Sequence, residues 1–300
     1  MSTVATIGFF DGVHLGHQCL IRQVRDEALR RCGHSLLITF DRHPRSVFAP
    51  ETAPRLLTSA AEKLELLRAT GVDDIYVLPF DREMASLTAR DFMQQVLRQQ
   101  LDVDTLVIGY DHHFGRPQGE GFEQYRAYGR EMGLEVVLAR ELEAEHVSSS
   151  AIRRALECGD VATANHLLGR PYSWTGRVVH GRAIGRQLGF PTANFEPQDP
   201  EKVLPARGAY AVRLRESGAR AMLNIGCRPT LDNGSDTTVE AHLLDFHGDL
   251  YNQTFTLSFI SRLREERRFD SEEELARQLQ HDESAARLAL SSDPQADTNP

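Results

Sequence analysis

Apolar residues along the first half of the chain follow two alternating patterns. Some runs are short and apolar throughout, which is typical of strands in a parallel sheet covered on both faces. Between these runs, apolar residues recur every three or four positions, as on one face of an amphipathic helix. The alternation of the two patterns predicts an α/β, Rossmann-like doubly wound domain. We predict its strands at residues 4–7, 35–40, 75–80, 105–108 and 134–138.

Capping signals locate several helices between and after these strands. Ser59 and Glu62 form a capping-box pattern, and Thr88 with Asp91 opens a further helix in the same way. The last two helices of this half are short, and they are expected to end the first domain near residue 170. We predict the remaining helices at residues 18–31, 119–133, 149–158 and 161–168.

Strict alternation of apolar and polar residues replaces these patterns after residue 170. Phe255, Leu257 and Phe259 alternate with polar neighbours, and residues 210–215 and 239–244 are further strand candidates. Gly and Pro punctuate the gaps between them. This pattern predicts an antiparallel sheet or a small antiparallel β-barrel.

Helical spacing returns near the end of the chain. Leu275, Leu279 and Leu288 mark the apolar positions of a helix predicted at residues 271–290. The polar, proline-bounded residues that follow are predicted to form a disordered tail. We therefore predict domains at residues 1–170 and 171–290, and a tail at residues 291–300.

Length, charge and cysteine content narrow the class of protein. The 300 residues exceed the usual size of one domain, and 41% of them are hydrophobic, enough for two cores. A net charge of -9 argues against nucleic-acid binding, which usually needs a basic face. No apolar run approaches a membrane span, and the first residues lack the basic start of a signal peptide. The four cysteines form no C-x-x-C pair, so a reducing cytoplasm is predicted.

The most informative motif is G-F-F-D-G-V-H-L-G-H at residues 8–17, between a predicted strand and a predicted helix. His14 and His17 lie at the start of that helix, where bare N–H groups and the helix dipole attract phosphate. The segment resembles the H-x-G-H signature of nucleotidyltransferases. A bare H-x-x-H match is weak, but the strand–turn–helix context favours a nucleotide site.

Two further polar segments directly follow predicted strands, where doubly wound folds bind ligands. The first, F-D-R-H-P-R at residues 40–45, is equally compatible with an ordinary polar loop that ends at a proline. In the second, at residues 109–115, Asp111 could bind a ribose hydroxyl or a ring N–H, and a glycine-bounded turn is the alternative.

Hydroxyl side chains gather at the start of the helix predicted at residues 149–158. Ser148, Ser149 and Ser150 exceed what a helix cap needs, although capping is the simpler interpretation. Arg153 follows one turn later. Together the hydroxyls, N–H groups and guanidinium are suited to a triphosphate.

The second domain carries its own candidate motif, G-R-Q-L-G-F-P-T-A-N at residues 185–194. Thr192 and Asn194 offer oxygen ligands of the kind that Mg²⁺ accepts. A hairpin connection is the simpler alternative for the loop taken alone. Glu240 lies within a predicted strand, where it is either a solvated residue or a general base that points into a barrel.

Taken together, these segments resemble the bacterial bifunctional riboflavin kinase/FAD synthetase family. Five motifs occur in the family order over residues 3–290, including N-I-G-C-R-P-T at residues 224–230 followed by V-E-A-H-L-L-D at residues 239–245. The resemblance implies that the second domain phosphorylates riboflavin to FMN. The first would then transfer AMP from ATP to FMN, giving FAD and pyrophosphate. It also implies that both reactions use ATP as co-substrate and require Mg²⁺. The sequence leaves open whether the protein forms a homo-oligomer.

The resemblance also assigns residues to each reaction. For adenylyl transfer it implies charge stabilisation by His14 and His17, an ATP site at Gly8, Asp11, Gly16, Ser148, Ser149, Ser150 and Arg153, and a flavin side at Phe40, His43, Pro44 and Asp111. For the kinase it implies Glu240 as base, a phosphate loop at Gly185, Arg186, Gly189 and Pro191, and Mg²⁺ ligands Thr192 and Asn194.

Two other functions stay open, one of them because of a departure from the family pattern. Many family members carry Asn where this chain has Phe9, so an amide near the ATP phosphates is lost. A riboflavin kinase with an impaired adenylyltransferase is therefore one alternative. A flavin-binding regulator without turnover is another, although the hydroxyl, histidine and glutamate positions are all filled.

Overall fold

The chain forms two compact units, Met1–Ser149 and Ser150–Pro300. The computed structural model describes residues 2–109, 114–115, 119–140, 147–181, 189–229, 235–246 and 248–291. Within these ranges, no helix combines the length and the apolar character that crossing a bilayer requires.

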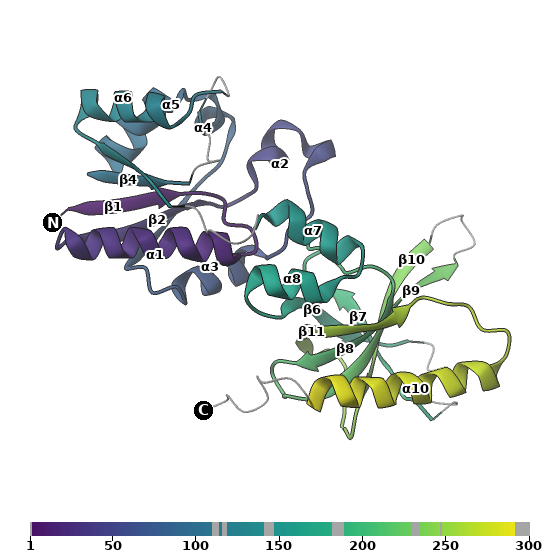
Figure 1. Cartoon of the computed structure of the whole chain (residues 1–300). Coiled ribbons are helices and arrows are strands. Elements are labelled where there is room, and N and C mark those ends of the chain that lie inside the picture. Colours follow the sequence, from purple (N-terminus) through teal and green to yellow (C-terminus); the bar gives the residue numbers. More distant parts are fainter. Residues whose placement is uncertain are drawn as a thin grey trace. The chain divides into compact units, whose positions relative to one another are not determined.

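The first unit is built on a five-stranded parallel sheet with the strand order β3-β2-β1-β4-β5, of which β2, β1 and β4 are labelled in Figure 1. The chain runs outward from β1 through β2 to β3, and then returns to the other side of β1 to form β4. A ligand crevice is expected where the direction changes, outside the carboxyl ends of β1 and β4. The strands are β1 (Thr3–Ile7), β2 (His34–Phe40), β3 (Asp74–Leu78), β4 (Thr105–Ile108) and β5 (Glu135–Leu138).

Helices cover both faces of this sheet, which confirms the predicted doubly wound fold. On one face, Ile7 and Ile38 pack with Phe92 and Tyr125 of the helices after β3 and β4. Alternate residues of the strands turn to the opposite face, where Leu37 packs with α1 and α3. The helices are α1 (Leu15–Arg30), α2 (Pro44–Phe48), α3 (Ala60–Arg68), α4 (Arg82–Ser86), α5 (Ala89–Phe92), its π-helical continuation Met93–Gln100, α6 (Phe122–Met132), and a 3-10 turn at Pro50–Thr52.

The second unit contains a closed antiparallel barrel with the order β10-β7-β6-β11-β8-β9 (Figure 1). Its interior is filled by alternate strand residues such as Tyr210, Val212 and Phe259, as the sequence pattern predicts. The strands are β6 (Tyr172–Val179), β7 (Ala193–Pro197), β8 (Gly208–Leu214), β9 (Arg220–Pro229), β10 (Ser235–Leu243) and β11 (Thr254–Glu265).

Two short helices precede the barrel: α7 (Ser149–Glu157) and α8 (Val161–Leu168). Asn165 of α8 joins them to the barrel, because its amide nitrogen donates to Phe259 O at 2.8 Å and its oxygen accepts from Tyr172 N at 2.7 Å. The compact units thus divide before these helices, whereas the sequence places the domain boundary after them. The boundary at residue 170 stays a prediction.

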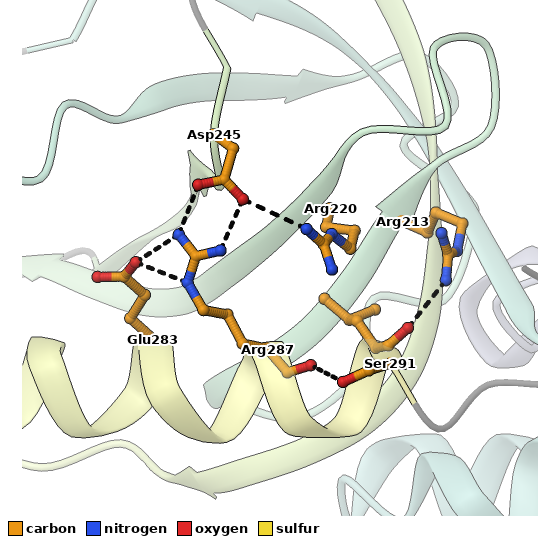
Figure 2. A network of polar contacts seen from close by, with 7 residues as sticks. Arg213, Arg220, Asp245, Glu283, Arg287 and Ser291 are labelled. Carbon is orange, nitrogen blue, oxygen red and sulfur yellow. Dashed lines mark hydrogen bonds and ion pairs between the residues drawn. The ribbon is translucent and has the colours of Figure 1, made fainter.

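The C-terminal helix α10 (Glu272–Ser291) covers the outer surface of the barrel. Leu290 packs against Ala211 and Met222, which is why β8 is buried on both faces. Figure 2 shows the polar contacts beside this packing: Arg287 of α10 binds both Asp245 and Glu283.

One predicted apolar position of α10 is wrong. Leu288 is 71% exposed, and Asp282, Ala286 and Leu290 are buried instead. Ser291, the first residue of the predicted tail, is the last residue of α10, and residues 292–300 lie outside the described ranges.

Candidate functional site

The turn between β1 and α1 has a strained backbone. Phe10 and Val13 adopt φ angles of 57° and 41°, on either side of Gly12 at 81°. A β-branched residue with positive φ is a genuine outlier, and each such residue costs about 1–3 kcal/mol. The side chains of Phe10 and Val13 offset this cost by packing in a core with Leu37 and α1.

Asp11 anchors this turn from within. Its carboxylate is 3% exposed and accepts hydrogen bonds from Leu57 N at 2.9 Å and Thr58 N at 3.2 Å. Gly12 N in turn donates to Thr58 Oγ1 at 3.1 Å. The sequence assigns Asp11 to the ATP site; the structure places its carboxylate on the backbone that leads into α3, and its contact with ATP stays a prediction.

The two histidines of the motif lie together at the start of α1. His14 is the N-cap of the helix, and its Nδ1 accepts from His17 N at 3.3 Å. The two rings are stacked with centroids 3.6 Å apart. A Cβ on Gly16 would lie 3.2 Å from the His14 ring, so glycine permits this close approach. The predicted position of His14 and His17 at a helix N-terminus is therefore confirmed.

The serine segment reaches the same turn from the end of the first unit. Ser149 Oγ donates to Asp11 O at 2.9 Å, and Val147 O lies 3.5 Å from the Cβ position of Gly16. The structure thus brings Val147 and Ser149, at the end of the first unit, to the histidine turn. Ser150 and Arg153 follow in α7 as part of the second unit.

His43 and Pro44 form the start of α2 directly after β2. The His43 Nδ1 accepts from Arg45 N at 3.1 Å, and Pro44 is the first helical residue. The ring of His43 meets that of Phe9 edge-on with centroids 4.8 Å apart. The predicted flavin-side residues His43 and Pro44 therefore lie beside the histidine turn, whereas Asp111 lies outside the described ranges.

Sequence reasoning missed Lys63 as part of this region. Its ammonium donates to Phe40 O at 2.9 Å and lies 3.8 Å from the centroid of the Phe9 ring. Burial lowers the pKa of Lys63 to about 8, while the charges of Asp11 and Asp41 act in the opposite direction. One signal was available, because the chain has only two lysines, and this one follows a capping-box glutamate on a leucine-rich helix.

The kinase candidates gather at a cavity of about 290 Å³ between the outside of the barrel and α10. Glu240 and Thr192 both line it, and Glu240 lies opposite Asn194 on β7 and Asn224 on β9. Glu240 therefore faces α10. Of the two placements that the sequence left open for Glu240, the one inside the barrel does not occur, because its neighbours Val239 and Ala241 are the buried residues of this strand.

The lining of this cavity includes both charged and apolar side chains. Arg264 Nε and Asp282 form an ion pair with distances of 3.1 and 2.9 Å to the two carboxylate oxygens, and Gln278 donates to Asp282 at 2.8 Å. These contacts fix α10 against β11. The apolar lining comes from Phe190, Met222, Phe269, Leu275 and Leu279.

A second cavity, of about 160 Å³, adjoins the first at Thr192. Pro191 and Ala193 line it on one side, and Asp249 and Tyr251 lie on the other. His242 Nδ1 lies 2.8 Å from Pro191 O, which fixes the backbone between the two cavities. Gly189 adopts a φ angle of 83°. Gly185 and Arg186 lie outside the described ranges.

Acidic, histidine and cysteine side chains of the described ranges do not form a cluster of three or more that could hold a metal ion by itself. The oxygen donors of Thr192 and Asn194 are of the type that Mg²⁺ accepts together with substrate phosphates and water. The donor chemistry beside Glu240 thus fits a metal that arrives with a nucleotide.

Comparison with known proteins finds a different family model in each half of the chain, in the order that the sequence motifs predict. A family model for FAD synthetase matches residues 1–151, and one for riboflavin kinase matches residues 168–290. The bifunctional riboflavin kinase/FMN adenylyltransferase of Pseudomonas fluorescens is 40% identical, with 95% of this chain and 92% of the relative covered.

More distant bifunctional relatives share the same span. The protein of that name from Escherichia coli (strain K12) is 38% identical, with 95% and 91% coverage, and that from Bacillus subtilis (strain 168) is 33% identical, with the same coverage. A crystal structure described as a macrolide-efflux protein from Streptococcus pneumoniae matches with a TM-score of 0.85 and 33% identity, covering 95% of this chain and 94% of that one.

Proposed function

We propose a division of two reactions between the two units of this chain, which belongs to the family of bifunctional riboflavin kinase/FMN adenylyltransferases. The chain phosphorylates riboflavin with ATP to give FMN, and it transfers AMP from ATP to FMN to give FAD. The residues that carry each reaction are our proposal. The stacked histidines at the start of α1 are the observation on which it chiefly rests.

In adenylyl transfer, an FMN phosphate oxygen attacks the α-phosphorus of ATP, and pyrophosphate leaves. The attacking group is already anionic, so no general base is needed. His14 and His17 donate to the charge that develops on the α-phosphate, and the N-terminal N–H groups of α1 add to this field. Catalysis is then positioning plus electrostatic stabilisation by a turn whose geometry is fixed before substrate binds.

The remaining residues of the first site hold the two substrates. Ser148, Ser149, Ser150 and Arg153 bind the triphosphate, and Gly8 and Gly16 belong to the same ATP site. The flavin phosphate lies on the side of Phe40, His43, Pro44 and Asp111. The contact between Ser149 and the Asp11 carbonyl supports this arrangement within the first unit.

In riboflavin phosphorylation, Glu240 accepts the proton of the ribityl 5′-hydroxyl as its oxygen attacks the γ-phosphorus of ATP. The apolar cavity beneath α10 accommodates the flavin ring, and the adjoining cavity accommodates the nucleotide. Their shared residue, Thr192, supports this division because hydroxyl and phosphate must meet between them. Thr192 and Asn194 would hold Mg²⁺, which neutralises phosphate charge when bound.

We propose that the protein acts in the cytoplasm on small molecules alone, namely riboflavin, FMN and ATP. The scattered cysteines and the net charge of -9 support a reducing compartment and no nucleic-acid partner. We propose no membrane partner, and we leave open whether the protein forms a homo-oligomer.

The test of the proposed function is incubation of the protein with riboflavin, ATP and Mg²⁺, followed by chromatography of the flavins. Flavin bound without FMN or FAD formation would favour the regulator alternative.

Withdrawal of Mg²⁺ is expected to stop both reactions. Excess EDTA should reduce FMN formation from riboflavin and FAD formation from FMN to background, because ATP phosphates then keep their full charge. Restoring free Mg²⁺ should restore both rates. Undiminished FMN formation in EDTA would contradict the assignment of Thr192 and Asn194.

Substitution of Gly181 by alanine is expected to lower riboflavin phosphorylation selectively. A Cβ at this position would lie 2.1 Å from Asn194 Nδ2, so the amide must move. Misplacement of a positioning group by about 1 Å costs about 100-fold in rate. Gly121→Ala is the control, because nothing lies within 4 Å of its Cβ. Unchanged FMN formation by Gly181→Ala would argue against a role for Asn194.

A further inference from the structure

Lys63 is a buried cation without a carboxylate partner in the part of the chain that the structure describes. Lys63 is 3% exposed. Within the described residues, its ammonium donates to Phe40 O and lies over the face of the Phe9 ring. Asp11 and Asp41 act on it through space. The chain uses arginine for nearly all other cationic positions, so lysine at this site is a specific choice.

Burying such an ammonium is unfavourable for folding. A charge removed from water costs free energy unless hydrogen bonds and counter-charges replace the lost hydration, and one carbonyl with one aromatic ring replaces it only in part. An unbranched apolar side chain of similar length would fill the same space without that cost. A buried ionised group beside a candidate catalytic turn is therefore a candidate for a functional role.

The position of Lys63 indicates what that role is. The stretch from Leu57 to Lys63 holds the strained histidine turn at two points: backbone N–H groups bind Asp11, and the ammonium binds the Phe9 ring. The same ammonium is tied to the carboxyl end of β2 through Phe40 O. Without it, the Phe9 ring loses its contact with α3, whereas Phe10 still packs with Leu67 of that helix.

We propose that Lys63 is a positioning residue for adenylyl transfer, whose ammonium ties Phe9 to the end of β2 and thereby holds the turn that presents His14 and His17. This inference rests on the proposed role of the two histidines. Lys63 acts through Phe9 and the backbone and does not itself contact the reacting phosphorus.

The charge state of Lys63 makes this role visible in a pH profile. Its neighbours from other elements are Asp11, Asp41 and, across the Phe9 ring, His43; on its own helix, Glu62 is engaged in the capping box with Ser59. The pKa of Lys63 is lowered to about 8, so the ammonium, and with it the hold on Phe9, is lost as pH rises through about 8. FAD formation from FMN should fall there, whereas FMN formation should not.

The stability of the fold should change in the opposite sense. The folded pKa of about 8 lies below the ordinary value of 10.5, so between these pH values the unfolded chain binds more protons. The contribution of Lys63 to stability therefore rises with pH across this window. A group that only stabilised the fold would instead lose function and stability together.

The test compares Lys63→Met with Lys202→Met, the equivalent change at the other buried lysine, which lies in the second unit. In Lys63→Met, the kcat of FAD formation from FMN is expected to fall about 10- to 100-fold with little change in KM, by analogy with other misplaced catalytic groups. Its FMN formation and thermal unfolding temperature should match or exceed those of the parent, and its drop in activity above pH 8 should vanish. Lys202→Met should keep full FAD formation from FMN.

Three results for Lys63→Met would overturn the inference. The variant could form FAD at the parent rate, it could lose FAD formation together with a lowered unfolding temperature, or its FAD formation could keep the drop above pH 8. Failure of the proposed histidine roles would look different. His17→Ala would then keep FAD formation, and the inference would fail together with those roles. If His17→Ala is inactive and Lys63→Met is fully active, the inference alone is wrong.

Discussion

Replacing His17 with alanine is expected to stop FAD formation while FMN accumulates. The ring of His17 is stacked on that of His14 at the N-terminus of α1, where the proposed α-phosphate charge develops. Removal of one such donor typically lowers kcat by about 100- to 1,000-fold. The measurement is chromatography of flavins after incubation with riboflavin, ATP and Mg²⁺, in which the parent protein should give FAD.

His34→Ala is the matched control for this experiment. His34 lies at the amino end of β2 and pairs with Asp74, at the edge of the sheet opposite the histidine turn. Both reactions should continue in this variant. If His17→Ala abolished FMN formation as well, although the protein stayed folded, the proposed division of the two reactions would be wrong.

Replacing Glu240 with glutamine is expected to have the opposite effect. Glutamine keeps the shape of the side chain in the cavity beneath α10 but cannot accept the hydroxyl proton, and loss of a general base costs about 100- to 10,000-fold in rate. FMN formation from riboflavin should cease, and FAD formation from supplied FMN should continue. The two rates are measured separately, with each flavin supplied alone.

An exposed glutamate of the neighbouring strand supplies the control. Glu196 of β7 pairs with Arg177 on the surface, and Glu196→Gln should preserve both activities. If Glu240→Gln still phosphorylates riboflavin rapidly, Glu240 is not the base.

A parent protein that phosphorylates riboflavin but makes no FAD from FMN would favour the alternative of an impaired adenylyltransferase, which the Phe9 departure keeps open.

Local signals in the sequence predicted most of the fold. The capping box of Ser59 and Glu62 is present at the start of α3, and β4 has the predicted bounds Thr105–Ile108. Such features depend on neighbouring residues and on burial patterns along one strand. The helix predicted from residue 18 begins earlier, at Leu15, because the side chain of His14 caps it.

The errors and omissions involve contacts between distant segments. Asp11 and Lys63 meet residues far from them in sequence, so no local pattern revealed that they hold one turn. Alternation in β10 could not decide whether Glu240 is solvated or points into the barrel, because the cavity beneath α10 forms only when a distant helix packs against the strands. Leu288 fitted the helical spacing, yet the barrel contacts a face centred on Ala286 and Leu290.

Complementation between the two variants shows whether each reaction has its own residues. Purified His17→Ala and Glu240→Gln are incubated with riboflavin, ATP and Mg²⁺, singly and together, and FAD is quantified. We expect no FAD from either variant alone and FAD from the mixture, because FMN released by His17→Ala is adenylylated by Glu240→Gln. If the mixture yields no FAD, or if a single variant yields it at the parent rate, the two reactions do not use separate residues of the two units.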